Sequence, residues 1–206
     1  MSDFSQWSYF KMPLYQRLIV AALSGALVGF LWAAQFFVPT DSKVPDYLRE
    51  WIILSIGGSI FSLAVMVPFL SARSIHWLRI LALIGIGSLS YWFALVTYGE
   101  LMIFSWLTDP PVTRSNLEIC LDRYAWEIAG LVGALIVGIG GVLFLRMKIQ
   151  WRFVLSIIIA GVLGGVVFDL LTVGPWIQLT SDSVISHAAW QTLVCAALCV
   201  AKIDTR

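Results

Sequence analysis

Charged residues are scarce in this sequence. They make up only 12% of the 206 residues, whereas soluble domains carry roughly 25%. Hydrophobic residues account for 60% of the chain, and its mean hydropathy is +0.89. Because a soluble globule of this length needs a larger polar surface, the composition predicts a protein whose solvent is a lipid bilayer.

The residues that build common catalytic and metal sites are also few. The two histidines, His76 and His187, are predicted to lie on opposite sides of the membrane, where they cannot share one metal ion. Cys120 lies in a polar connection while Cys195 and Cys199 lie in an apolar run, so the three cysteines indicate no disulfide framework. The net charge of +1 argues against a nucleic-acid partner. We expect no metal and no other cofactor, we assign no catalytic residue, and an enzymatic role is not favoured.

What the sequence does contain is long apolar runs. Six runs of about 20 residues are each long enough to cross a bilayer as a helix. We therefore predict an all-α, polytopic integral membrane protein in which residues 1–206 form one transmembrane domain, a six-helix bundle. The predicted spans are residues 17–38, 51–70, 77–97, 124–145, 152–173 and 184–201. Residues 101–107 either extend the third helix or form a short interfacial segment before Asp109-Pro110-Pro111.

The distribution of positive charge predicts the orientation. Nine of the thirteen Lys and Arg residues fall on the side of the two termini, and four fall on the other side. Both termini are therefore expected in the cytoplasm. The lack of a leader peptide and of a glycosylation signal favours a bacterial inner membrane. Seven tryptophans near the predicted span ends, Trp32, Trp126 and Trp190 among them, are expected to lie at the membrane interfaces.

Small residues recur at steps of four along three predicted helices. Such stripes let helix backbones approach closely in lipid, where close contact needs small side chains. We interpret them as helix-packing positions within the bundle. An alternative is that one stripe, with the first helix favoured, faces a partner subunit. The principal positions are Gly25, Gly29, Gly130, Gly138, Gly161 and Gly165.

Three titratable side chains occur within the predicted spans, at similar depth toward the outer side. Glu127 and Asp169 continue the small-residue faces of their helices, and His187 begins a polar row that continues with Gln191. With Tyr124 they are predicted to line an outward-facing pocket that binds a polar ligand or cation, or relays protons. Alternatively, each has a purely structural role, such as an Asp169–His187 pair, a Glu127 that reaches the interface or an interfacial His187.

The favoured function is therefore binding or transport of a small molecule or ion at this polar cluster. In length and layout the chain is similar to the substrate-binding components of vitamin importers, by architecture alone. The alternatives are a structural or regulatory subunit of a larger membrane complex and, third, a membrane-embedded lipid-modifying enzyme. The expected partners are the lipid bilayer and either a second copy of the chain or another membrane subunit.

Overall fold

The structure is a computed structural model that describes residues 12–34, 46–70, 77–107, 123–172 and 179–201. Six helices in these ranges are long and apolar enough to cross a membrane. Their bounds are α1 Leu14–Ala34, α2 Asp46–Phe61, α3 Trp77–Leu107, α5 Ala125–Leu145, α6 Trp151–Thr172 and α7 Leu179–Val200. The third helix thus continues without a break to Leu107. Residues 35–38 of the first predicted span and residue 173 of the fifth lie outside the described ranges.

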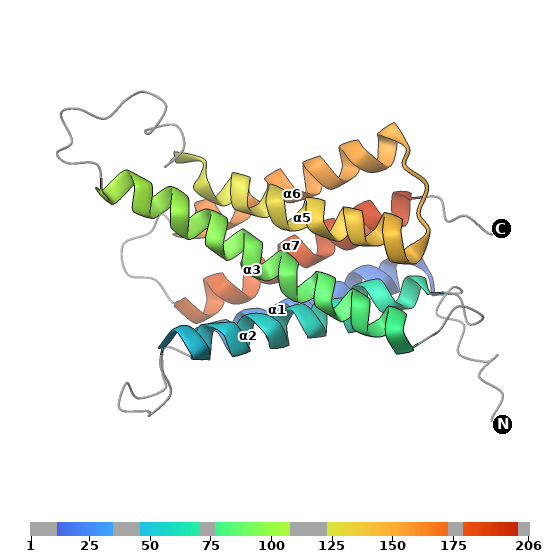
Figure 1. Cartoon of the computed structure of the whole chain (residues 1–206), viewed down its shortest axis with the longest axis horizontal. Helices are drawn as coiled ribbons and strands as arrows, with labels where there is room; N and C mark the ends of the chain where they lie inside the picture. The colour runs from blue at the N-terminus through green and yellow to red at the C-terminus, as the bar shows by residue number, and fades with distance from the viewer. Residues whose placement is uncertain (1–11, 35–45, 71–76, 108–122, 173–178, 202–206) are drawn as a thin grey trace.

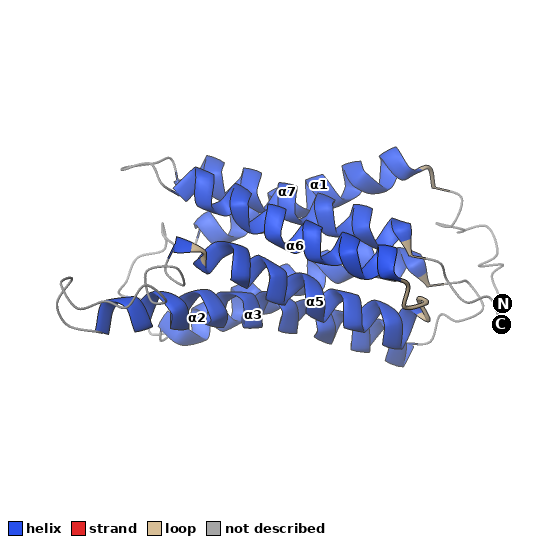
Figure 2. Ribbon diagram, turned by 90° about the horizontal axis from the view of Figure 1, so that it is seen from above, coloured by secondary structure: helices blue, strands red, loops and turns tan. Residues whose placement is uncertain are grey.

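The helices lie along one common axis and alternate in direction (Figure 1, Figure 2). Helix α1 begins, and helix α7 ends, at the same end of the bundle as the turn between α5 and α6 (Figure 1). We call this the terminal end and the opposite one, where α5 and α7 begin, the far end. Large apolar side chains such as Leu23, Leu143 and Leu170 are 64–71% exposed on the outside of the bundle. Soluble proteins rarely expose so much apolar surface, so the six helices suggest a multi-pass membrane protein.

Helix α1 packs chiefly against α7, far away in the sequence. A side chain on Gly25 would overlap the backbone carbonyl of His187, and one on Gly29 would overlap that of Ser183. Two backbones can approach this closely only where the side chain is absent. The small-residue face of α1 is therefore covered by α7 of the same chain, and the alternative that it faces a partner subunit is wrong.

Helices α5 and α6 are in closest contact toward the far end. A side chain on Gly130 would overlap the Gly161 carbonyl, and one on Gly165 would overlap the backbone of Glu127. At Gly138 the contact has loosened, because a Cβ there would lie 3.3 Å from the Ile157 side chain. The two ribbons, yellow and orange in Figure 1, then diverge toward the turn that joins them. The pair is thus tight at one end and open at the other.

Helix α2 ends irregularly, as a π-helical turn at Ser62–Met66 followed by a 3₁₀ turn at Val67–Phe69. Pro68 explains the irregularity, since proline has no N–H to donate and its ring collides with the carbonyl four residues earlier in a regular helix. The Ser62 hydroxyl donates to the Leu83 carbonyl of α3 at 2.6 Å. This bond fixes the altered turn to its neighbour.

Candidate functional site

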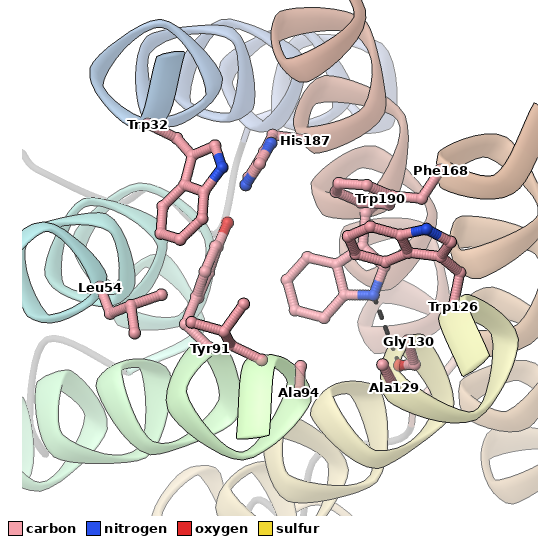
Figure 3. Close-up of a pocket in the computed structure, with 11 residues that line it drawn as sticks. Trp32, Leu54, Tyr91, Ala94, Trp126, Ala129, Gly130, Phe168, His187 and Trp190 are labelled. Atoms are coloured by element: carbon pink, nitrogen blue, oxygen red, sulfur yellow. Dashed lines mark hydrogen bonds between the residues drawn. The ribbon is translucent and has the colours of Figure 1, made fainter. Parts of the chain in front are cut away.

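The far half of the bundle contains a cavity of about 90 Å³. All six long helices contribute to its wall, so it exists only in the assembled bundle. Most of the lining is aromatic, and none of the described lining residues carries a formal charge when the histidine is neutral. The lining residues are Trp32, Leu54, Tyr91, Ala94, Leu95, Trp126, Ala129, Gly130, Phe168, His187 and Trp190 (Figure 3).

Ring contacts join the aromatic wall into one cluster. Trp126 stacks on Phe168 with ring centroids 4.9 Å apart, and Phe168 meets the edge of His187 at 5.1 Å. Tyr91 stacks on His187 at 6.0 Å and contacts Trp190 at 5.4 Å. These are the separations at which aromatic pairs attract beyond their buried area, so the rings hold one another in place around the cavity.

Two glycines make the space for Trp190. A Cβ on Gly164 of α6 would overlap the indole, and one on Gly133 of α5 would lie 3.1 Å from it. The ring is therefore buried between the two helices, with 5% of the residue exposed. The indole therefore faces neighbouring helices and not lipid, whatever its depth in the membrane. Trp32 and Trp126, which are near the far ends of α1 and α5, also line the cavity.

A hydrogen-bonded network lies beside the cavity. Gln191 is fully buried; its Oε1 accepts a hydrogen bond from the Ser24 hydroxyl at 2.5 Å, and its Nε2 donates to the Tyr91 hydroxyl at 2.6 Å. The amide thereby joins α7 to α1 and α3. Buried polar groups of this kind are stable only when they are paired, as these are.

His187 is 8% exposed, and its Nδ1 lies 2.8 Å from the Ser183 carbonyl one turn earlier. A carbonyl only accepts, so Nδ1 must be the donor, and in the neutral imidazole Nε2 is left as an acceptor. Figure 3 shows the imidazole, the indole nitrogen of Trp32 and the hydroxyl of Tyr91 turned toward one another at one corner of the cavity. Three polar groups from three helices thus converge beside an otherwise apolar wall.

The predicted site residues fall into two groups. His187 and Gln191 belong to the cavity and its network. Tyr124 is 47% exposed, with the Arg123 guanidinium 5.8 Å from its ring centroid, and does not line the cavity. Glu127 and Asp169 are partly buried and do not line it either. The buried Oε2 of Glu127 has no hydrogen-bond partner among the residues that the structure describes.

Sequence reasoning missed Ser24 and Tyr91, and it did not place Trp32 at this site. The polar row at His187 and Gln191 was a usable signal, because spacing by four places both on one helix face. Nothing comparable marks their partners, since a serine, a tyrosine and a tryptophan in an apolar helix fit many positions.

No family model, curated protein or solved structure matches this chain. Within the described ranges, no group of three or more His, Cys, Asp or Glu side chains could hold a metal ion. The chemistry of the site is therefore inferred from its own residues.

Proposed function

We propose that this protein binds a small, uncharged, largely apolar molecule with a single hydroxyl or carbonyl oxygen inside the bundle, as a binding or transport protein of the membrane. The observation that supports this function is the meeting of His187, Trp32 and Tyr91 at one corner of an aromatic cavity (Figure 3). Ligand sites are commonly apolar pockets with a few convergent polar groups that fix orientation.

The three groups complement one oxygen atom. The Tyr91 oxygen already accepts from Gln191, and its own proton has no acceptor among the described residues. The indole N–H of Trp32 likewise has no acceptor among the described residues. Two donors and the Nε2 acceptor of His187 can therefore bind a hydroxyl group, and the donors alone can bind a carbonyl. The bond from Gln191 polarises the tyrosine hydroxyl and makes it a stronger donor.

An uncharged ligand fits better than an ion. Transfer of an unpaired charge into an apolar site costs several kcal/mol. The carboxylates that could balance a cation, Glu127 and Asp169, do not line the cavity. The aromatic walls instead match a flat or compact apolar body.

We also propose that the terminal end faces the cytoplasm, in a bacterial inner membrane. Arg17, Arg79 and the three cations of the α5–α6 turn support this orientation, since all are near the helix ends that meet at the terminal end. His187 lies five residues beyond Asp182, where its candidate span begins, at a depth of about 7.5 Å. The ligand would then reach the site from the outer side.

A series of one-ring probes tests the binding proposal. Purified protein in detergent is titrated with para-cresol, toluene, benzoate and benzyltrimethylammonium, with tryptophan fluorescence as the readout. We expect para-cresol to bind most tightly. Replacement of His187 by Leu or of Trp32 by Phe should lower the affinity for para-cresol about fivefold, which is the equivalent of one hydrogen bond of about 1 kcal/mol. The affinity for toluene should remain nearly unchanged.

Trp51→Phe is the matched control, because Trp51 is half exposed and does not line the cavity. Equal affinity for toluene and para-cresol, or equal effects of Trp32→Phe and Trp51→Phe, would refute the proposal. Tightest binding of the quaternary ammonium would replace it with recognition of a cation by the aromatic rings. A second chain that co-purifies in fixed ratio and closes the cavity would favour the subunit function.

A further inference from the structure

A second hollow lies on the outside of the bundle, between α5 and α6. It has a volume of about 300 Å³, and all of its described lining residues are apolar: Leu135, Gly138, Ile139, Val142, Leu143, Ile149, Phe153, Val154 and Ile157. It exists because the two helices touch at Gly130 and Gly161 and then diverge toward their turn (Figure 1). Along α5 the lining runs from Leu135 to Leu143, which is roughly 12 Å. We call this hollow the α5–α6 groove.

Three exposed cations lie in and beside the turn that joins α5 to α6, at the terminal end. Arg146 ends α5, Lys148 lies in the turn, and Arg152 is in the first turn of α6. The segment 146–152 contains no acidic residue. Ile149 and Phe153, which line the groove, alternate with these cations in the sequence. The turn therefore places positive charges next to residues that line the α5–α6 groove.

The backbone holds Arg146 in an uncommon conformation. Its φ is 55° and its ψ 37°, in the left-handed region that favours glycine. The N–H groups of Arg146 and Met147 both donate to the Gly141 carbonyl, which closes the end of α5. A glycine would satisfy this position more easily, so the arginine is present against the local backbone preference, a pattern that is common at functional sites.

We propose that the α5–α6 groove binds an anionic phospholipid, with one acyl chain between the helices and the phosphate at Arg146, Lys148 and Arg152. The charge of the turn selects the lipid. An anionic headgroup gains from three cations at the membrane surface, whereas a choline or ethanolamine headgroup would add a positive charge beside them. The groove selects a chain-bearing ligand over a free phosphate. This inference rests on the membrane setting proposed above and is independent of the aromatic cavity.

Lipid retention by the full-length protein tests the proposal. Protein in detergent is mixed with phosphatidylglycerol and phosphatidylcholine of identical acyl chains in equal amounts, separated from free lipid and analysed by native mass spectrometry. We expect one retained phosphatidylglycerol per chain. The triple variant Arg146→Gln, Lys148→Gln and Arg152→Gln should retain it about a hundredfold less, at about 1 kcal/mol for each cation. Arg79→Gln, at the same end of the bundle but on α3, is the control and should retain it fully.

Two further measurements separate the contribution of the groove to lipid retention from that of the headgroup site. Ile139→Trp, at a half-exposed position of the groove, should block the chain and reduce retention, while Leu163→Trp, exposed on α6 outside the groove, should not. Glycerol 3-phosphate, which has the headgroup phosphate and no acyl chain, should not displace the lipid. An unchanged thermal unfolding transition and gel-filtration profile verify that each variant is folded, and neither depends on ligand binding at the cavity.

The proposal is overturned by equal retention of the two lipids, by full retention in the triple variant or by displacement with glycerol 3-phosphate. It is also overturned if Ile139→Trp and Leu163→Trp retain the lipid alike. Loss of both lipids from the wild-type protein would count against the membrane setting as well.

Discussion

At the scale of single residues, Gln191 shows how a polar side chain can stabilise an apolar bundle. It is fully buried on α7, yet both ends of its amide are paired with side chains of other helices, Ser24 and Tyr91. Hydrogen bonds between membrane helices contribute about 0.6 kcal/mol each on average. Their larger effect is on geometry, because the amide fixes the orientation of the Tyr91 hydroxyl at the cavity.

Replacement of Gln191 by Leu, which is similar in size, removes both bonds and should lower the free energy of unfolding by about 1 kcal/mol. It should also lower the affinity for para-cresol, since Tyr91 loses the hydrogen-bond donor that polarises its hydroxyl group. Unfolding in mixed micelles measures the first effect. Thr192→Val is the control on the next residue, because the Thr192 hydroxyl donates only within α7, to Ala188 at 2.7 Å. Equal stability of the two variants would show that the network contributes nothing.

At the scale of helices, glycines set the distance between neighbours. Gly25 and Gly29 bring α1 onto α7, and Gly130 with Gly161 brings α5 onto α6. The same residue type has no such function at Gly85 of α3, where an added Cβ would have nothing within 4 Å. The contrast offers a direct test within one chain.

Gly25→Ala should destabilise the bundle by about 1–3 kcal/mol, because the added methyl group meets the rigid backbone of α7 and the helices must separate. It should also lower the affinity for para-cresol, since His187 lies on the displaced helix. Gly85→Ala should leave stability unchanged or raise it by about 0.5–1 kcal/mol, since it adds no clash and removes a glycine from a helix interior. Thermal unfolding in one detergent compares them. A larger loss for Gly85→Ala would contradict this packing.

Sequence periodicity predicted the helices well, but it predicted few of the residues that line the cavity between them. Apolar runs predicted the six long segments because burial in lipid needs length and hydropathy alone. Spacing by four also placed His187 and Gln191 on one face. It could not reveal that Tyr91 and Trp32 face them, because the rotation of one helix against another depends on packing. Nor could it reveal that two glycines distant in sequence make a buried slot for Trp190.

At the scale of the whole molecule, α5 spans the distance between the two ends. Its 21 residues extend about 31 Å, which matches a hydrocarbon core of about 30 Å. Tyr124 precedes it at the far end and Ile149 follows it at the terminal end, and both are exposed. In a membrane these two residues should therefore lie on opposite sides.

Single cysteines at Tyr124 and Ile149, in a chain without its three native cysteines, test this arrangement. An impermeant maleimide added to intact cells should label the cysteine at position 124, and should label that at position 149 only after the membrane is permeabilised. The reverse result would invert the proposed orientation. Labelling of both from the same side would rule out a membrane-spanning α5.

The contact between α1 and α7 has a consequence for the order in which the protein is made. During synthesis α1 enters the membrane first of the described helices, and α7 enters last. Until then the face with Gly25 and Gly29 has no partner within the chain, and the cavity lacks His187 and Trp190. Helix α1 must therefore stay in lipid or beside the insertion machinery until α7 is inserted and packs against it. The aromatic cavity is complete only when α7 has left the ribosome.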